Sequence, residues 1–367
     1  MTTKKIYYTE NPATLILCTY TPDNKIHDIH AYFEEFLNLI KTAEVEYDEV
    51  LLWKPRAIDT SHFLTKGKLQ ELKEICEKNE IKQVICSKEL TPLQERNLHN
   101  ALDCSIVDRS ALILEIFHKA AHSSEGKIQV EIAELEYLKT RLSGRGKELA
   151  QQAGFIGGKG PGETEKESLR RYYETKIKQS KKKLISLEKS RQTQRKKRLE
   201  SNIPLVALVG YTNAGKSSVL NALTKSDILA EDKLFSTLDT TTRSLYLDTS
   251  KKILLSDTVG FISELPHHLI EAFKSTLDEL KYANLILHVV DISNPMWKDH
   301  IEIAKEILNE LGVKGDVLFV FNKSDLAKNI DDLEEEFKNY NHFVITETKT
   351  KKGITPLLEY IKVYKFN

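Results

Sequence analysis

An eight-residue segment, residues 210–217, limits the fold of this chain more than any other part of the sequence. It consists of Gly-Tyr-Thr-Asn-Ala-Gly-Lys-Ser and matches the pattern of a phosphate-binding P-loop. The apolar residues 204–209 predict a buried strand before it, and a helical pattern follows it. In this setting backbone amides converge on phosphate oxygens at the start of a helix. The segment therefore predicts an α/β domain that binds a nucleoside phosphate.

The side chains of this loop have distinct expected roles. Lys216 is expected to reach the β- and γ-phosphates, and the Ser217 hydroxyl is expected to ligate Mg2+. The other loop residues expected to bind the nucleotide are Gly210, Tyr211, Thr212, Asn213, Ala214 and Gly215. The loop pattern alone does not separate ATP from GTP.

A second segment, at the end of another expected strand, supplies the switch beside the γ-phosphate. It consists of Asp257, Thr258, Val259 and Gly260. Asp257 would hold Mg2+ through a water molecule, and the Gly260 amide would sense the γ-phosphate. This segment follows the P-loop at the spacing expected for a GTPase.

A third segment decides which base is bound. It consists of Asn322, Lys323, Ser324 and Asp325, again at the end of an expected strand. The Asp325 carboxylate can accept two hydrogen bonds from guanine, whereas adenine would leave it unpaired in a desolvated site. Asn322 would support the base and the P-loop, and the Lys323 stem would cover the ring. The three segments together predict GTP.

Another switch must lie between Ser217 and Asp257. Residues 235–243 carry four threonines, and only one hydroxyl is needed to complete the magnesium shell. Thr237, Thr241 and Thr242 are the candidates. The last two are also explained by the start of a β-branched strand.

The remainder of residues 201–367 predicts a mostly parallel sheet covered by helices on both faces. Helical spacing is found over residues 269–280 and 356–363. Expected strands cover residues 244–247, 252–255, 285–290, 317–321 and 343–346.

Residues 1–115 alternate between strand and helix patterns and predict a small N-terminal α/β domain. Helical spacing of apolar residues covers residues 30–40 and 69–76. Expected strands cover residues 14–20, 49–53 and 83–87.

Residues 116–200 predict a long antiparallel helical hairpin. Leu135, Leu142 and Leu149 lie seven residues apart after Ile128, and a second apolar stripe runs from Leu169 to Leu187. From Thr164 to Glu200 the chain has 14 Lys or Arg residues and 5 Glu residues, although its formal net charge is zero overall. A solvated helix face accounts for many such runs, but this excess of positive charge favours a polyanion partner.

The segment between the two expected helices is rich in glycine and carries Arg145, Lys147 and Lys159. One interpretation is a flexible linker. The other is a loop that approaches an RNA backbone, with Phe155 available to stack on a base.

Cysteine use and hydropathy exclude several classes of protein. The four cysteines form no CxxC pair, so a zinc site or a secreted disulfide framework is not expected. No apolar run approaches the length of a membrane span or a signal-peptide core. We therefore expect a soluble cytoplasmic protein without a membrane span.

Taken with their context, these motifs resemble those of the HflX family of GTPases. The P-loop resembles the family's version in full, and residues 257–262 resemble its second switch. The resemblance extends to residues 65–69, 90–98, 106–114 and 160–164, and so covers residues 10–367. Residues 235–239 resemble the family's first switch, in which the counterpart of Thr237 binds Mg2+. The expected nucleotide-binding residues of this switch are Phe235, Ser236, Thr237, Leu238 and Asp239.

The resemblance implies a ribosome-associated GTPase. It implies binding to the large ribosomal subunit, with the hairpin loop near ribosomal RNA of the peptidyl-transferase centre, and splitting of stalled or idle ribosomes under stress. The expected cofactor is Mg2+ with GTP as substrate, and the expected form is a cytoplasmic monomer that associates peripherally with ribosomes or membrane. Lys216, Thr237 and Gly260 are the expected catalytic residues.

Two departures from the family pattern stand out. Thr240 occupies a position at which the family usually has proline. The base-flanking element, usually Ser-Ala, corresponds to Glu347, Thr348 and Lys349, which are expected to contact guanine through backbone amides.

Hydrolysis by the isolated protein is expected to be slow. Phe261 follows the glycine of the second switch, where many GTPases have a glutamine that orients the attacking water. The ribosome could order the switches, or K+ could bind beside the phosphates at Asn213. Asn213 is equally explained by ordinary loop hydrogen bonds.

Two other functions share these motifs. One is an RNA-binding or large-subunit assembly factor in which the nucleotide only times release. The other is a regulator whose hairpin binds a protein. The GTPase that splits ribosomes is the leading hypothesis.

Overall fold

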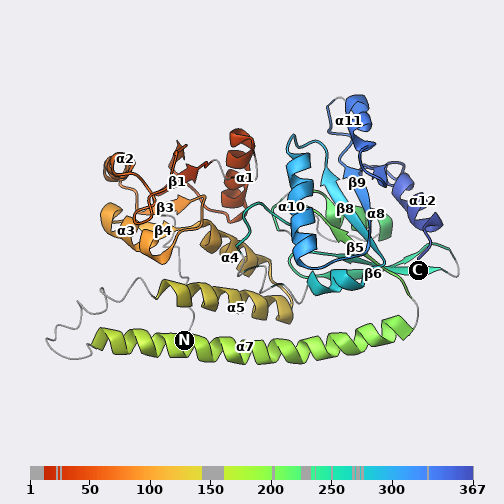
Figure 1. The fold of residues 1–367 in the computed structure, drawn as a ribbon, viewed down its shortest axis with the longest axis horizontal. Coiled ribbons are helices and arrows are strands. Elements are labelled where there is room, and N and C mark those ends of the chain that lie inside the picture. The colour runs from red at the N-terminus through yellow and green to blue at the C-terminus, as the bar shows by residue number, and fades with distance from the viewer. Residues whose placement is uncertain are drawn as a thin grey trace. The chain divides into compact units, whose positions relative to one another are not determined.

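The computed structural model describes most of the chain and groups it into two compact units (Figure 1). Unit 1 combines Met1–Asn24, Tyr32–Lys119 and Lys127–Leu184, and unit 2 combines Lys25–Ala31, Ala120–Gly126 and Ile185–Asn367. Within residues 161–200, side chains are described for 166–187 and 189. The described residues are 12–21, 24, 27–142, 161–200, 203–224, 233–235, 237–248, 251–266, 269, 273, 277–328 and 330–366. The three-domain division expected from the sequence stays a prediction.

Unit 1 contains a parallel four-stranded sheet in the order β2-β1-β3-β4. The strands are β1 (Thr14–Thr19), β2 (Glu49–Trp53), β3 (Gln83–Cys86) and β4 (Ser105–Val107). Every residue of β1 and β3 is buried, as expected for inner strands covered on both faces. All four cysteines are buried free thiols.

Four helices accompany this sheet. They are α1 (Ile29–Thr42), α2 (Lys66–Lys78), α3 (Pro92–Leu102) and α4 (Arg109–Ala120). The first two were expected from apolar spacing, and the last two were not. Helix α3 begins with a capping box in which the side chains of Thr91 and Gln94 each bond the other's backbone, with Pro92 in the first turn.

The expected helical hairpin is confirmed by α5 (Ser124–Arg141) and α7 (Pro161–Glu200). Ser180 donates a 2.8 Å hydrogen bond to Glu131, and Lys139 forms a 3.7 Å ion pair with Glu174. As the residue number falls along α5 it rises along α7, so the two helices are antiparallel. Ile177 on α7 is buried, as its apolar stripe predicts. Leu149, the glycine-rich segment and its residues Arg145, Lys147, Phe155 and Lys159 lie outside the described residues.

Unit 2 contains a six-stranded sheet in the order β10-β9-β8-β5-β7-β6. Only β6, at one edge, is antiparallel to its neighbour. This confirms the mostly parallel sheet. The strands are β5 (Leu205–Val209), β6 (Thr241–Tyr246), β7 (Lys252–Asp257), β8 (Leu285–Asp291), β9 (Asp316–Asn322) and β10 (Phe343–Ile345).

Helices cover both faces of this sheet. One apolar cluster joins α8 (Lys216–Thr224) and α12 (Thr355–Val363) to one face. The opposite cluster joins α10 (Trp297–Glu310) and α11 (Ile330–Phe337) to the alternate side chains of β8 and β9. A short 3-10 helix, Asp278–Tyr282, precedes β8. The parallel strands β5, β7, β8 and β9 therefore all end at one edge, where the functional motifs gather.

The described part of the chain contains no helix with the length and apolar character needed to cross a membrane.

Candidate functional site

The expected P-loop connects the end of β5 to the start of α8 and is held tightly against its neighbours. Gly210 has φ +147°, and a Cβ added there would lie 2.1 Å from the carbonyl oxygen of Val289. Gly215 has φ +94°, and its Cβ would lie 2.4 Å from the amide nitrogen of Asn322. Both positions therefore require glycine, for backbone conformation and for space.

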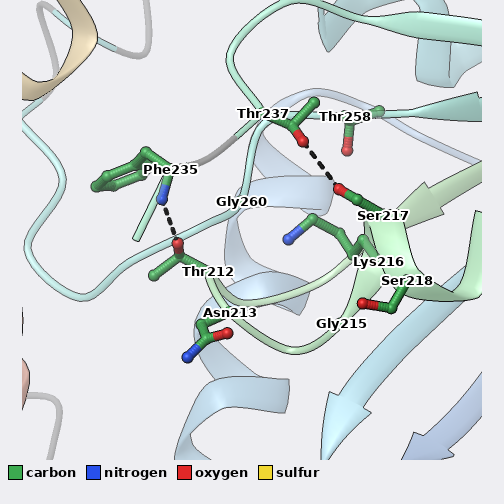
Figure 2. Close-up of a pocket in the computed structure, with 10 residues that line it drawn as sticks. All are labelled: Thr212, Asn213, Gly215, Lys216, Ser217, Ser218, Phe235, Thr237, Thr258 and Gly260. Carbon is green, nitrogen blue, oxygen red and sulfur yellow. Dashed lines mark hydrogen bonds between the residues drawn. The ribbon is translucent and has the colours of Figure 1, made fainter. Parts of the chain in front are cut away.

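Ten residues from three segments line a pocket at this loop (Figure 2). All except Ser218 were expected from the sequence to bind the nucleotide. They are Thr212, Asn213, Gly215, Lys216, Ser217, Ser218, Phe235, Thr237, Thr258 and Gly260. The structure thus brings the P-loop and both switch segments together around one cavity.

Lys216 is buried at the centre of this pocket. Its ammonium group donates to the carbonyl oxygens of Tyr211 at 2.9 Å and of Gly210 at 3.2 Å. Burial lowers the pKa of Lys216 to about 8, and the nearby Asp257 carboxylate offsets part of this effect. The buried Lys216 ammonium group, which is hydrogen-bonded to two carbonyl oxygens, is therefore well placed to bind an anionic ligand.

Ser217, Thr237 and Asp257 meet at one side of the pocket. The Ser217 hydroxyl donates to the Asp257 carboxylate at 2.6 Å and lies 2.8 Å from the Thr237 hydroxyl (Figure 2). Burial raises the pKa of Asp257, while Lys216 and the Ser217 hydrogen bond oppose that rise. The three oxygen-bearing side chains come from α8, the first switch segment and the end of β7.

The donor set fits Mg2+. Two adjacent ligands on an octahedral magnesium ion with bonds of about 2.1 Å lie about 3.0 Å apart. The hydrogen-bonded Ser217 and Thr237 hydroxyl oxygens, 2.8 Å apart, lie close to that separation. Hydroxyl and carboxylate oxygens are also the ligand types that Mg2+ prefers.

The other two threonines take part in the sheet instead. Thr241 pairs with Asp257 and Thr242 with Ser256 in the ladder between β6 and β7. Of the three candidates, the structure therefore places only Thr237 against Ser217. Phe235 is buried and donates its backbone N–H to the Thr212 hydroxyl at 2.8 Å, whereas Ser236 lies outside the described residues.

The second switch segment is fixed to the P-loop by its backbone. Thr212 N–H donates to Phe261 O at 2.6 Å, and Phe261 N–H donates to Gly210 O at 3.1 Å. A Cβ on Gly260 would lie 2.7 Å from the Cα of Thr212 and 2.9 Å from the Lys216 ammonium. The Phe261 ring is buried. The Phe261 side chain, directly after Gly260, is thus packed in the interior and has no hydrogen-bonding group that could orient a water molecule.

His300 also supports this loop, although sequence analysis missed it. Its ring stacks on Tyr211 with centroids 3.7 Å apart, and the Tyr211 hydroxyl accepts a 2.6 Å hydrogen bond from Ser263 N–H. Burial lowers the pKa of His300 to about 4, against the opposing effects of Asp291 and Asp299. A neutral ring therefore backs the P-loop near pH 7. No local sequence pattern marks this pairing.

The expected guanine-reading residues lie at the end of β9. Asn322 is buried and donates its side-chain amide to Ala214 O at 3.0 Å, as expected of a residue that supports the P-loop. The Lys323 ammonium lies 2.7 Å from the Asp291 carboxylate, and the Lys349 ammonium lies 2.6 Å from the Asp325 carboxylate. Thr346, which sequence analysis also missed, is buried and donates to the Asn322 side-chain oxygen at 3.2 Å. Asn322 therefore links the P-loop to Thr346 at this corner.

The base-flanking element forms a self-contained turn. The Glu347 carboxylate accepts hydrogen bonds from the backbone N–H groups of Lys349 at 2.8 Å and Thr350 at 3.1 Å. Hydrogen bonds, first from the Thr350 side chain, lower the pKa of Glu347. The Glu347 N–H donates to Gly353 O at 3.3 Å. Contacts of Glu347, Thr348 and Lys349 with guanine remain a prediction.

Leu238 and Asp239, which were also expected to bind the nucleotide, do not line the described pocket. Leu238 is buried. The Asp239 carboxylate accepts hydrogen bonds from Ser123 and His122 rather than lining the described pocket. A contact between Asp239 and the nucleotide stays a prediction.

Comparison with protein families matches three consecutive parts of the chain. Residues 30–118 match "GTP-binding GTPase N-terminal", and residues 120–198 match "GTP-binding GTPase Middle Region". Residues 205–323, which include the P-loop and the Asn322 corner, match "50S ribosome-binding GTPase".

Individual proteins and structures agree with these matches. The chain is 46% identical over 334 residues to a GTPase HflX of Caldanaerobacter subterraneus, covering 90% of this chain and 77% of that protein. It is 37% identical over 349 residues to GTPase HflX of Escherichia coli, covering 95% of this chain and 81% of that protein. A crystal structure of an SsGBP and GDP complex is similar with a TM-score of 0.50 and 26% identity, covering 95% of this chain and 97% of that one.

Proposed function

The chain belongs to the HflX family of ribosome-associated GTPases and hydrolyses GTP, and we propose that it uses this activity to split stalled or idle ribosomes. In this proposal GTP and Mg2+ bind at the pocket of Lys216, Ser217 and Thr237, and the protein binds the large ribosomal subunit. The observation that carries the nucleotide part is the meeting of Ser217, Thr237 and Asp257 within hydrogen-bond distance.

Each group in the pocket has one task in hydrolysis. Lys216 binds the β- and γ-phosphates, exchanging its present carbonyl partners for phosphate oxygens. Ser217 and Thr237 would hold Mg2+ directly, and Asp257 would hold it through water. Bound Mg2+ supplies charge neutralisation at the phosphates. The Gly260 amide binds the γ-phosphate, and Asp325 selects guanine.

Activation must come from outside the free protein. Phe261 is buried and has no hydrogen-bonding side chain to orient the attacking water. Ordering of the two switch segments by the ribosome supplies that orientation in our proposal. The isolated enzyme is therefore slow and the ribosome-bound enzyme is faster.

A monovalent cation beside the phosphates is the second source of activation. Asn213 is one of the residues that line the pocket and has φ 60° (Figure 2). In this variant of the proposal, K+ accelerates turnover more than Na+, and Asn213→Ala removes the difference. Equal rates in the two salts would exclude it.

The ribosome-binding surface is proposed to be the basic helix α7 together with residues 145–159. The family description of residues 205–323 names 50S ribosome binding. On α7, Lys181, Lys182 and Lys183 are exposed, and the Lys181 ammonium lies 2.7 Å from the Glu136 carboxylate. Exposed cations along one helix suit the phosphate backbone of ribosomal RNA. The protein acts here as a cytoplasmic monomer.

Sucrose-gradient sedimentation tests the splitting activity. We expect the GTP-bound protein to lower the intact-ribosome peak and raise the subunit peaks. Deletion of residues 145–159 should abolish splitting while leaving guanine-nucleotide affinity unchanged. If the full chain binds large subunits without changing the intact-ribosome peak, the assembly-factor function is favoured. If binding is insensitive to salt, the hairpin binds a protein instead.

A further inference from the structure

The carboxylate of Asp239 holds the start of helix α5. Its Oδ2 accepts hydrogen bonds from the backbone N–H groups of His122 at 2.9 Å and Ser123 at 2.7 Å. Its Oδ1 accepts a 2.5 Å hydrogen bond from the Ser123 hydroxyl. All three residues belong to unit 2, although 116 positions separate Asp239 from Ser123.

Ser123 links this contact to the helix itself. It lies immediately before α5 (Ser124–Arg141), and its hydroxyl accepts a 2.9 Å hydrogen bond from Gly126 N–H in the first turn. The same hydroxyl therefore caps the helix and donates to Asp239. The negative charge of Asp239 also lies where the partial positive charge of a helix N-terminus favours it.

Gly126 leaves space for this carboxylate. A Cβ built on Gly126 would lie 2.3 Å from Asp239 Oδ1 and 3.3 Å from its Cγ. Gly126 is helical and has no positive φ, so its backbone does not require glycine. The approach of Asp239 is the structural reason for a glycine here, at a position where alanine would favour the helix.

On the other side, Asp239 lies two residues after Thr237, whose hydroxyl lies 2.8 Å from that of Ser217 in the nucleotide pocket. Leu238 between them is buried. Because the buried Leu238 side chain fixes the backbone between them, Thr237 and Asp239 cannot move independently. The position of Asp239 therefore constrains that of Thr237.

We propose that Asp239 is a positioning residue that couples helix α5 to the first switch segment, so that the start of α5 sets whether Thr237 stands at its magnesium-binding position. The proposal rests on the role of Thr237 proposed above. Helix α5 is one continuous helix of 18 residues, about 27 Å long. Displacement of the hairpin on binding a partner would therefore reach Thr237 through Ser123 and Asp239. By reciprocity, GTP binding that fixes Thr237 stabilises the start of α5.

The Gly126→Ala substitution tests this coupling at a position where alanine favours the helix. The added Cβ would also lie 3.2 Å from the Ser123 hydroxyl oxygen. The added methyl group displaces the Asp239 carboxylate, which is the end of a side chain that can rotate away. We expect the turnover number of the protein to fall about fivefold, which corresponds to about 1 kcal/mol, the contribution of one ordinary hydrogen bond. The dissociation constant for GDP should stay unchanged, because neither Asp239 nor Gly126 lines the pocket.

Gly67→Ala is the matched control. Gly67 also lies in the first turn of a helix, α2 (Lys66–Lys78), and an added Cβ would meet no atom within 4 Å. This variant should hydrolyse GTP at the wild-type rate. Thr237→Ala serves as the reference for loss of the magnesium-binding hydroxyl.

Hydrogen exchange provides a second readout that does not depend on Thr237. A non-hydrolysable GTP analogue with Mg2+ should slow amide exchange over residues 120–128 in the wild-type chain and in Gly67→Ala. In Gly126→Ala this protection should be lost, while protection of the P-loop remains. Wild-type turnover by Gly126→Ala, or analogue-dependent protection of residues 120–128 that survives in it, would overturn the coupling. Normal turnover by Thr237→Ala would instead overturn the proposed role of Thr237. The hydrogen-exchange result for residues 120–128 would then still show whether α5 and the first switch segment are coupled.

Discussion

The hydroxyl oxygens of Ser217 and Thr237 lie 2.8 Å apart, although 20 positions separate them in the chain. Ser217 is held by the start of α8, and Thr237 belongs to the segment before β6. Their separation is close to that of neighbouring ligands on Mg2+, which agrees with the proposed role of this pair in binding the metal. The first prediction follows from this pair.

Thr237→Ala should lower the turnover number for GTP about 10- to 100-fold, since it removes one ligand from the ion that neutralises the phosphates. Thr237→Ser should restore most of the activity because it keeps the hydroxyl. The measurement is steady-state hydrolysis across a range of Mg2+ concentrations. Thr241→Ala is the control, because Thr241 takes part in the β6 ladder. Equal losses of activity in the Thr237 and Thr241 variants would show that Thr237 is not the metal ligand.

Buried histidines should make the protein sensitive to acid. Burial lowers the pKa of His300 to about 4 and that of His288 to about 3, whereas an unfolded histidine has a pKa of about 6.5. Between pH 6.5 and 4 the unfolded chain thus binds more protons at these sites, so stability falls as the pH falls.

His300→Phe should preserve the stack on Tyr211 and remove one of these protonation sites. The free energy of unfolding, measured by urea denaturation from pH 7 to 4.5, should then decline less steeply than in the wild type. The difference in slope is at most about 1.4 kcal/mol per pH unit. An unchanged slope would mean that His300 does not contribute to acid sensitivity.

The fold was largely predictable because its elements have strong local patterns. Strand β2 was predicted at its observed limits, and the hairpin followed from two apolar stripes. Helix α4 was missed because most of its side chains are buried, which leaves no amphipathic stripe. Helix α3 was missed although Thr91, Pro92 and Gln94 form a recognisable start signal.

The parts of the site that lie in contiguous sequence motifs were predictable. The P-loop, Asp257 and Asn322 segments carry their chemistry in fixed local spacing. Thr346, His300 and the partner of Asp239 depend on tertiary packing between distant segments. A single sequence contains no spacing rule for such contacts, so only the structure could place them.

Base selection provides the third prediction. Asp325→Asn should weaken GTP binding about 100-fold and improve binding of xanthosine triphosphate, whose base edge matches the amide. The measurement is competition of both nucleotides for one labelled analogue. Because the Lys349 ammonium lies 2.6 Å from Asp325, Lys349→Ala is the control and should retain the preference for GTP. An Asp325→Asn protein that still prefers GTP would refute the guanine assignment.

The basic helix provides the fourth prediction. Replacement of Lys181, Lys182 and Lys183 by alanine should weaken binding to large subunits and make the plot of log affinity against log salt shallower by about 2. The reduction is below three because Lys181 also pairs with Glu136. A control triple on α2, Lys66, Lys73 and Lys78 to alanine, removes equally exposed charges. If both triples have the same slope as the wild type, the α7 lysines are only solvated.

GTP turnover by the protein, alone and with purified large ribosomal subunits, is the decisive test of ribosome-dependent activation. Buried Phe261 offers no group to orient water, so the account predicts slow hydrolysis by the free protein. Large subunits should raise the rate at least about tenfold, which corresponds to about 1.4 kcal/mol of activation free energy. Rapid turnover by the isolated protein that does not respond to large subunits would contradict the account.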